Sequence, residues 1–276
     1  MTTSTAYGVR GLSVELGGRT VLHDVTVESS PGQVVAVVGG DGAGKSTLLR
    51  TIVGEVAPAR GSVHAPDPSR TGYLPASAGS WAALTVRQNI DFAAGVYGLT
   101  GERLEARRGE LLDRASLTAA ADRPASQLSG GMRRKLGFCM AVVHEPDLLV
   151  LDEPTTGVDP VSRVDLWRLV AQTAAQGTAV VMTTTYLDEG ERAAALTVLD
   201  DGHVLAQGAV DDVLSGLDGT VTSALEPVRP AWAWRRGRTV HELWAPGETP
   251  TGEVVRPDLE DVVVALSLRH RAAVAS

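Results

Sequence analysis

The most constraining feature of this sequence is the stretch VVAVVGGDGAGKSTLL, which spans residues 34–49. Residues 34–38 form an almost unbroken β-branched run, and such runs are typical of a buried parallel strand. Residues 39–46 then fit the spacing G-x-x-x-x-G-K-[ST], and residues 47–50 continue as a helix. In this context the loop backbone turns its N–H groups toward phosphate oxygens at the positive end of the helix. The stretch therefore predicts an α/β fold that binds a nucleoside triphosphate.

Individual residues of this loop have separate roles in that prediction. Its glycines let the backbone bend, Lys45 would reach the β- and γ-phosphates, and the Ser46 hydroxyl would ligate Mg²⁺. The predicted nucleotide-binding residues are Gly39, Gly40, Asp41, Gly42, Ala43, Gly44, Lys45, Ser46 and Thr47. The sequence contains only two lysines, Lys45 and Lys135, and uses arginine elsewhere. Since a compact ammonium and a planar guanidinium are not interchangeable, the site itself requires lysine at position 45.

The length, net charge and cysteine content of the sequence limit the classes of protein to which the chain can belong. A chain of 276 residues can form one large α/β domain with an appendage or two small domains. Its net charge of −8 argues against a general nucleic-acid binder. The single cysteine, Cys139, lies among apolar residues, which favours a reducing cytosol and a small buried side chain. Without an apolar run of roughly 18 residues or a signal-like N-terminus, we expect any work at a membrane to go through a partner.

The first half of the chain is predicted to consist of strands followed by helices. Alternating apolar residues predict antiparallel strands within residues 9–30, and residues 61–65 form a further short strand. Thr85 and Gln88 have the spacing of a capping box. The expected helices cover about residues 85–97, about 102–115, and a segment capped by Ser129 that reaches about residue 143. This helical block, roughly residues 76–145, separates two groups of parallel strands.

The second half returns to an alternation of strands and helices. The expected elements are a strand at 148–151, a helix from Pro160, a strand at 178–182, a hairpin at 196–206 and a helix at about 210–217. Short strands, one at 232–234, and an amphipathic helix from Pro257 follow. We predict a core domain at 1–217 and a small C-terminal α+β extension at 218–276. The tryptophans and arginines at 232–238 have two interpretations: stacking on nucleic-acid bases, or an amphipathic strand of a small β unit. We favour the amphipathic strand, so no nucleic-acid partner is expected.

Three further motifs follow the glycine-rich loop. They are LSGGM at residues 128–132, LLVLDE at 148–153 and TGVD at 156–159. With the loop at 39–46 as Walker A, they resemble the signature motif, Walker B and D-loop of the nucleotide-binding subunits of ABC transporters. The resemblance covers roughly residues 9–215, and the signature motif is specific to that superfamily. It implies a P-loop NTPase fold of the ABC ATPase type, with an antiparallel β subdomain and a helical subdomain, and ATP with Mg²⁺ as ligands.

The resemblance assigns chemical roles to the Walker B residues. Asp152 follows a buried strand and would hold Mg²⁺ together with Ser46, directly or through water. Glu153 is the implied catalytic residue, because in the family the second carboxylate polarises the attacking water.

The resemblance also implies a dimer. Ser129, Gly130 and Gly131 begin a helix and would present amides and a hydroxyl to the γ-phosphate held by the opposite subunit. Asp159 of the D-loop would lie across the same dimer interface. Two such chains would therefore sandwich two ATPs, and one chain alone would not build a complete site.

The segments SGGMRRKLG, from Ser129, and PDLEDV, from Pro257, look like the ATP-binding subunits of ABC-2-type exporters, including drug-resistance exporters. The implied partners are an integral membrane permease subunit and a second ATP-binding subunit, either a sister or another copy. The implied location is cytoplasmic, peripheral at the inner face of the cell membrane. Two alternatives remain open: a non-hydrolysing nucleotide-binding regulatory subunit, and a soluble ABC ATPase outside transport. The short helical block argues against the second alternative.

Three positions depart from the family pattern. Leu16 replaces the aromatic residue that stacks on adenine, Ala76 replaces a glutamine near Mg²⁺, and Thr185 replaces a histidine that contacts the γ-phosphate. A stacked base is worth roughly 1–3 kcal/mol, so adenine should be held more loosely. Catalysis depends on groups that stabilise the transition state, so ATP binding can survive while turnover falls. Since Glu153 remains, we expect a degenerate subunit that turns ATP over slowly alone and completes the site of a sister ATPase.

Overall fold

The computed structural model of the chain describes residues 6–77 and 79–275. Residues 1–5, 78 and 276, which belong to the predicted domain ranges, lie outside the described residues. The strands are β1 (Tyr7–Leu16), β2 (Arg19–Ser29), β3 (Val34–Val38), β4 (Arg60–His64), β5 (Thr71–Leu74), β6 (Leu148–Leu151), β7 (Ala179–Thr184), β8 (Ala195–Asp200), β9 (His203–Gly208), β10 (Thr220–Ala224), β11 (Ala233–Arg236), β12 (Thr239–Trp244) and β13 (Glu253–Val255). The helices are α1 (Lys45–Ile52), α2 (Val86–Val96), α3 (Gly101–Arg114), α4 (Gly130–Val142), α5 (Pro160–Ala175), α6 (Leu187–Gly190), α7 (Val210–Ser215) and α8 (Leu259–Ala275). None of these described helices is both long and apolar enough to cross a bilayer.

The central sheet has the strand order β5-β6-β7-β3-β8-β9, and its neighbours are parallel except β8 and β9. The parallel strand predicted at residues 34–38 is confirmed as β3 and is buried along its whole length. Val35 and Val37 pack into one core cluster, and Ala36 and Val38 pack into the other. Both faces of the sheet are therefore covered, which explains the unbroken apolar run.

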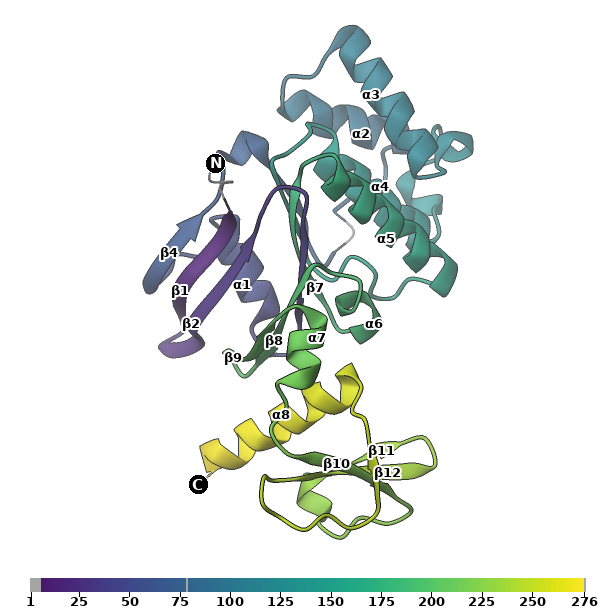
Figure 1. Cartoon of the computed structure of the whole chain (residues 1–276). Coiled ribbons are helices and arrows are strands. Elements are labelled where there is room, and N and C mark those ends of the chain that lie inside the picture. The colour runs from purple at the N-terminus through teal and green to yellow at the C-terminus, as the bar shows by residue number, and fades with distance from the viewer. Residues whose placement is uncertain (1–5, 78, 276) are drawn as a thin grey trace.

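One face of the central sheet is covered by α1 and a second, antiparallel sheet. The strands predicted within residues 9–30 are confirmed as β1 and β2, and β4 pairs with the other edge of β1. Leu22 of β2 and Leu48 of α1 share a core cluster with Val35 of β3. Figure 1 shows this sheet on the side of β7 away from helices α2 to α5.

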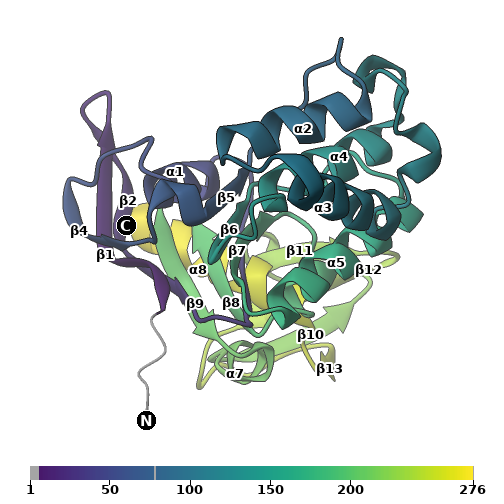
Figure 2. The same cartoon turned by 90° about the horizontal axis from the view of Figure 1, so that it is seen from above.

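The other face is covered by helices, among them the predicted helical block of α2, α3 and α4 (Figure 2). The capping box at the start of α2 is confirmed: the Thr85 hydroxyl accepts from the Gln88 N–H, and the Gln88 side chain accepts from the Thr85 N–H. Ser129 caps α4 as predicted, since its hydroxyl accepts from the Met132 N–H at 3.2 Å. Helix α4 lies against α2, α5 and β5 and buries Phe138.

The elements after the helical block agree with the prediction, with small shifts at their ends. Helix α5 begins at Pro160, and β8 and β9 form the predicted hairpin. Strand β7 continues two residues beyond the predicted end at residue 182, because Thr183 and Thr184 pair with the last residues of β3. This extension brings two threonines to the edge of the sheet where the glycine-rich loop begins.

The C-terminal strands form a four-stranded antiparallel sheet with the order β11-β12-β10-β13. The strand predicted at 232–234 is wrong at its first position, because Trp232 ends a 3₁₀ turn at Pro230–Trp232 and β11 starts at Ala233. Proline has no N–H to donate to a ladder and is favoured at the start of such a turn.

Helix α8 connects the C-terminal sheet to the larger core. It begins at Leu259, two residues after the predicted start at Pro257. Asp258 precedes the helix, and its carboxylate accepts from the Asp261 N–H at 2.9 Å, as a capping residue does. Leu259 and Val262 are buried in the core cluster that also contains β3, and α8 packs on α7. The division into a core domain and an extension therefore stays a prediction.

The tryptophan and arginine side chains of β11 contact acidic residues of α8. Trp234 Nε1 donates to the Asp261 carboxylate at 3.1 Å, and Arg236 forms ion pairs with Asp258 and Glu260. These contacts agree with the interpretation of this segment as an amphipathic strand.

Cys139 offers a test of the packing of α4. Its side chain is fully buried, and burial raises the pKa of its thiol to about 12. The thiolate is the nucleophile, so at pH 8 we expect iodoacetamide to label the native chain at least about 100-fold more slowly than the urea-unfolded chain. Mass spectrometry of timed samples measures both rates, and similar rates would contradict the packing.

Candidate active site

The glycine-rich loop between β3 and α1 passes close to neighbouring backbone. Gly44 has a φ of +102°, and a Cβ there would lie 2.7 Å from Leu22 Cδ2 and 3.1 Å from the Val21 carbonyl oxygen. A Cβ at Gly39 would lie 2.1 Å from the carbonyl oxygen of Leu199. Glycine at these two positions lets the loop lie over the carboxyl end of β3 and begin α1 at residue 45. The first N–H groups of α1 have no partner within the helix and favour an anion.

Lys45 is buried at the start of α1, with 5% of its surface exposed. Its ammonium donates to the carbonyl oxygens of Gly39, at 2.9 Å, and Gly40, at 3.0 Å. The Lys45 Nζ also lies 3.3 Å from Glu153 Oε1. The buried charge is therefore both hydrogen-bonded and paired, as burial of an ammonium requires. Because Glu153 follows β6, this pair joins the loop after β3 to the end of β6, across β7.

Thr183 orients both acidic residues of the Walker B motif. Its hydroxyl donates to Asp152 Oδ1 at 2.8 Å and accepts from the Glu153 N–H at 3.0 Å. Asp152 is 2% exposed, so this bond satisfies part of a buried carboxylate. Glu153 has a φ of +46°, a conformation that costs of order 1–3 kcal/mol outside glycine and that surrounding contacts must hold.

Arg134 on α4 supplies more of these contacts. Its acceptors are the carbonyl oxygens of Pro75, Ser77, Asp152, Glu153 and Pro154. The side chain is 4% exposed, and burial lowers the pKa of Arg134 while the charges of Asp152 and Glu153 oppose that shift. One guanidinium thus ties α4 to the turn that carries Glu153 and to both neighbours of Ala76.

Seven of the nine predicted nucleotide-binding residues, all but Gly39 and Gly40, line a cavity of about 290 Å³. The lining residues are Val21, Asp41, Gly42, Ala43, Gly44, Lys45, Ser46, Thr47 and Glu153. The structure therefore brings Glu153 to the same cavity as most of the glycine-rich loop. Asp152 lies directly beside Glu153 in the chain, at the end of β6.

The signature residues lie beside the D-loop of the same chain and do not line this cavity. A Cβ at Gly131 would lie 2.4 Å from Ser162 Oγ, and one at Gly130 would lie 3.8 Å from the Gly157 carbonyl oxygen. Asp159 caps α5, since its carboxylate accepts from the Ser162 N–H at 3.0 Å. Hydrogen bonds from Ser162 lower the pKa of Asp159.

The three residues expected to depart from the family pattern lie at the ends of different strands, and none of them lines the cavity. Leu16 ends β1 at the hairpin into β2 and is 42% exposed. Ala76 follows β5, and Thr185 follows β7 with its side chain exposed. Tyr7, an aromatic residue upstream of Leu16, packs against the core under the antiparallel sheet.

Sequence reasoning missed Arg134 and Thr183 as residues that shape the site. Arg134 stands in the run Arg133-Arg134-Lys135, and nothing in that run marks one cation as buried against carbonyl oxygens. Thr183 stands among three consecutive threonines. The available signal for Thr183 was its place at the carboxyl end of the strand expected beside the Walker B strand, where its hydroxyl could reach Asp152.

The fold and the site together define a P-loop NTPase: a glycine-rich loop after β3, an ammonium at the helix start, and two carboxylates after a strand of the same sheet. Comparison with known proteins is consistent with this class. A family model described as ABC transporter matches residues 22–156.

Several curated proteins are similar to the chain. The probable multidrug ABC transporter ATP-binding protein YbhF of Escherichia coli is 38% identical over 216 residues, which cover 74% of this chain and 37% of YbhF. The Nod factor export ATP-binding protein I of Rhizobium etli is 33% identical, with 78% of this chain and 72% of that protein covered. The daunorubicin resistance ATP-binding protein DrrA3 of Streptomyces coeruleorubidus is 34% identical, with 78% and 72% covered.

Solved structures of ABC ATP-binding subunits are also similar to the chain. A structure of an ATP-binding subunit of an ABC transporter matches with a TM-score of 0.70 at 29% identity, covering 77% of this chain and 93% of that one. The ATP-binding cassette MJ0796, in a dimeric post-hydrolysis state, shares the fold with a TM-score of 0.65 at 22% identity, covering 73% of this chain and 97% of that one. The chain belongs to the ABC transporter family.

The Lys45 contacts predict its contribution to nucleotide binding. Replacement of Lys45 by alanine should weaken MgATP binding by about 10- to 100-fold, because a hydrogen bond to a charged group contributes about 1.5–3 kcal/mol. Isothermal titration calorimetry measures the change. Arg50→Ala is a matched control, since Arg50 lies on the same helix, is 51% exposed and pairs with Glu55. Equal losses in both variants would contradict the role of Lys45.

Proposed function

We propose that this chain is the ATP-binding subunit of an ABC-2-type exporter and couples MgATP binding and hydrolysis to transport through a separate membrane subunit. The observation that carries the proposal is the pairing of Lys45 with Glu153 at one cavity, in a chain of this family. The names of its relatives, which describe multidrug, Nod factor and daunorubicin-resistance ATP-binding proteins, support the exporter class. In this proposal the subunit works in the cytoplasm, at the inner face of the membrane.

The roles of individual residues belong to the same proposal. The glycine-rich loop and Lys45 hold the ATP phosphates, and Glu153 polarises the attacking water. Ser46 and Asp152 hold Mg²⁺, which would neutralise phosphate charge. Their oxygen donors suit this ion, and the Thr183 bond keeps the Asp152 carboxylate in place.

We further propose that a second ATP-binding subunit completes the site. The signature residues 129–131 lie beside Asp159 of their own chain and do not line its nucleotide cavity. Ser129 and Gly130 are exposed, and in this proposal they face the ATP of a sister subunit. With Ala76 and Thr185 in place of the expected glutamine and histidine, this chain's own site holds ATP while the sister site does most of the hydrolysis.

The exposed position of Thr185 makes the degenerate site testable by repair. The isolated chain should bind MgATP but hydrolyse it slowly, and Thr185→His should raise turnover on the order of 10²-fold, because one transition-state donor contributes roughly that much. Single-turnover hydrolysis with enzyme in excess measures both. Fast hydrolysis by the unmodified isolated chain, abolished by Glu153→Gln, would contradict the proposal. A repaired variant that stays inactive would favour the non-hydrolysing regulatory subunit, which Ala76 and Thr185 also suit.

Assembly with partners gives the second test. The tagged full chain should co-purify with a multi-span membrane protein and a second ATP-binding subunit. In that assembly Ser129→Ala should lower turnover at least tenfold and leave MgATP binding by the isolated chain unchanged. Thr85→Ala is the control, since Thr85 caps α2 with the same chemistry as Ser129 caps α4, and each cap contributes about 1 kcal/mol. Co-purification with ribosomes or DNA and no membrane protein would indicate a soluble ABC ATPase instead.

A further inference from the structure

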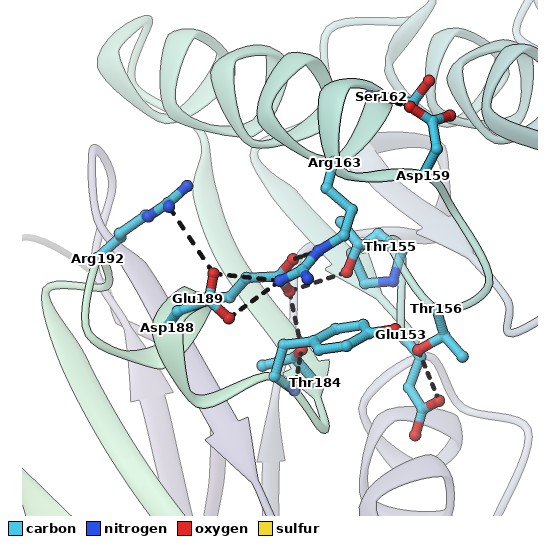
Figure 3. Close-up of polar contacts among 12 residues, drawn as sticks. Glu153, Thr155, Thr156, Asp159, Ser162, Arg163, Thr184, Asp188, Glu189 and Arg192 are labelled. Atoms are coloured by element: carbon cyan, nitrogen blue, oxygen red, sulfur yellow. Dashed lines mark hydrogen bonds and ion pairs between the residues drawn. The ribbon is translucent and has the colours of Figure 1, made fainter. Parts of the chain in front are cut away.

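Glu189 on the short helix α6 is a buried carboxylate that the roles proposed above do not use. It is 1% exposed. Its Oε2 accepts from the hydroxyls of Thr155, at 2.9 Å, and Thr184, at 2.8 Å. Its Oε1 accepts from Arg163 Nε at 3.3 Å. Figure 3 shows the carboxylate at the centre of these partners.

The partners come from three separate segments around the site. Thr155 lies two residues after Glu153, and Thr184 immediately precedes Thr185. Arg163 lies on α5, one turn after Asp159. Glu189 therefore links the turn after β6, the loop after β7 and the helix that follows the D-loop.

The burial of the Glu189 carboxylate is not explained by stability alone. A carboxylate loses favourable hydration when it is buried, and an apolar side chain of similar size often gives equal or greater stability. Thr155 and Thr184 are also buried, at 1% and 0% exposure, so their hydroxyls depend on Glu189 as their acceptor. The cluster is fully connected, and connected buried networks fix one geometry.

The last two residues of β7, Thr183 and Thr184, hold the strand end that leads into the loop with Thr185. Thr183 bonds to Asp152 and to the Glu153 N–H. Thr184 donates to Glu189 and accepts from the Tyr186 N–H at 3.0 Å. The Arg163 guanidinium lies 3.7 Å from the centre of the Tyr186 ring. Thr185 thus sits between two fixed residues.

We propose that Glu189 is a positioning residue for ATP hydrolysis: it joins Thr155 to Thr184 and so sets the place of Glu153 relative to the loop that carries Thr185. It acts through these hydroxyls and does not touch the nucleotide. The proposal rests on the ATPase function of the chain. The bonds of Glu189 go to Thr155, Thr184 and Arg163 and not to the glycine-rich loop, so we expect this contact to affect hydrolysis far more than nucleotide affinity.

Glu189→Gln tests the proposal with little change in size. The amide NH2 group cannot accept a hydrogen bond, so either the contact from Arg163 or the two contacts from the threonine hydroxyls are lost in their present form. We expect the single-turnover rate of the full chain to fall at least tenfold while the Kd for MgATP changes less than twofold. Thr184→Val should reproduce this split, and Thr184→Ser, which keeps the hydroxyl, should restore the rate to within threefold of the original.

A matched control and a second measurement separate positioning from general stability. Glu242 is also a buried glutamate, at 3% exposure, and accepts hydrogen bonds in the C-terminal sheet, so Glu242→Gln should leave the rate unchanged. Amide hydrogen exchange should speed up in residues 183–187 of Glu189→Gln, with α1 unaffected.

The outcomes that would overturn the proposal are distinct. An unchanged rate in Glu189→Gln, an equal loss in Glu242→Gln, failure of Thr184→Ser to recover, or unaltered exchange in residues 183–187 would each do so. Absence of hydrolysis by the original chain, alone and with its partner subunits, would overturn the ATPase function itself, and the exchange data would then show separately whether Glu189 holds the loop.

Discussion

Strand β7 lies between β3 and β6, and parallel pairing on both of its edges determines which residues meet at the site. Parallel strands place their carboxyl ends at one edge of a sheet, where ligands of such folds bind. The loop after β3 supplies Lys45, the end of β6 supplies Asp152 and Glu153, and β7 supplies Thr183 between them. The Lys45–Glu153 pair therefore depends on a strand order that no single motif contains.

Two properties of the site, ATP binding and ATP turnover, depend on different residues at this edge of the sheet. The buried ammonium of Lys45 and the bond between Asp152 and Thr183 belong to the parts that, in the proposed function, hold a phosphate and its metal. By the resemblance to the family, a glutamine and a histidine are expected at the positions of Ala76 and Thr185. At Ala76 the backbone is nevertheless fixed, because Arg134 binds the carbonyl oxygens on both sides of it. The loop geometry is thus maintained without the side chain that would use it, which fits ATP binding better than rapid turnover.

The sequence predicted the elements well wherever the signal was local. The strand at 34–38, the capping box at Thr85 and the cap at Ser129 are patterns within a few residues, and all three are confirmed. The end of β7 was misjudged because threonine is compatible with a loop, and only pairing with β3 shows that Thr183 and Thr184 belong to the strand. The start of β11 was misjudged because a tryptophan after a proline can belong to either a turn or a strand.

The interior partners of the site were beyond sequence reasoning for a physical reason. Arg134 and Glu189 are long charged side chains, which usually face solvent, and burial becomes favourable only when several acceptors or donors surround them. Along the sequence, the partners of Arg134 lie 18 to 59 residues away and those of Glu189 up to 34 residues away. No local sequence pattern therefore predicts these contacts. In the folded chain the two charged side chains bind different groups. Arg134 donates to the backbone carbonyl oxygens on both sides of Ala76, and Glu189 accepts from the hydroxyl of Thr184, directly before Thr185. Arg134 and Glu189 thus fix the backbone beside Ala76 and Thr185, which fits our proposal that this subunit keeps an ordered site and completes the site of a sister.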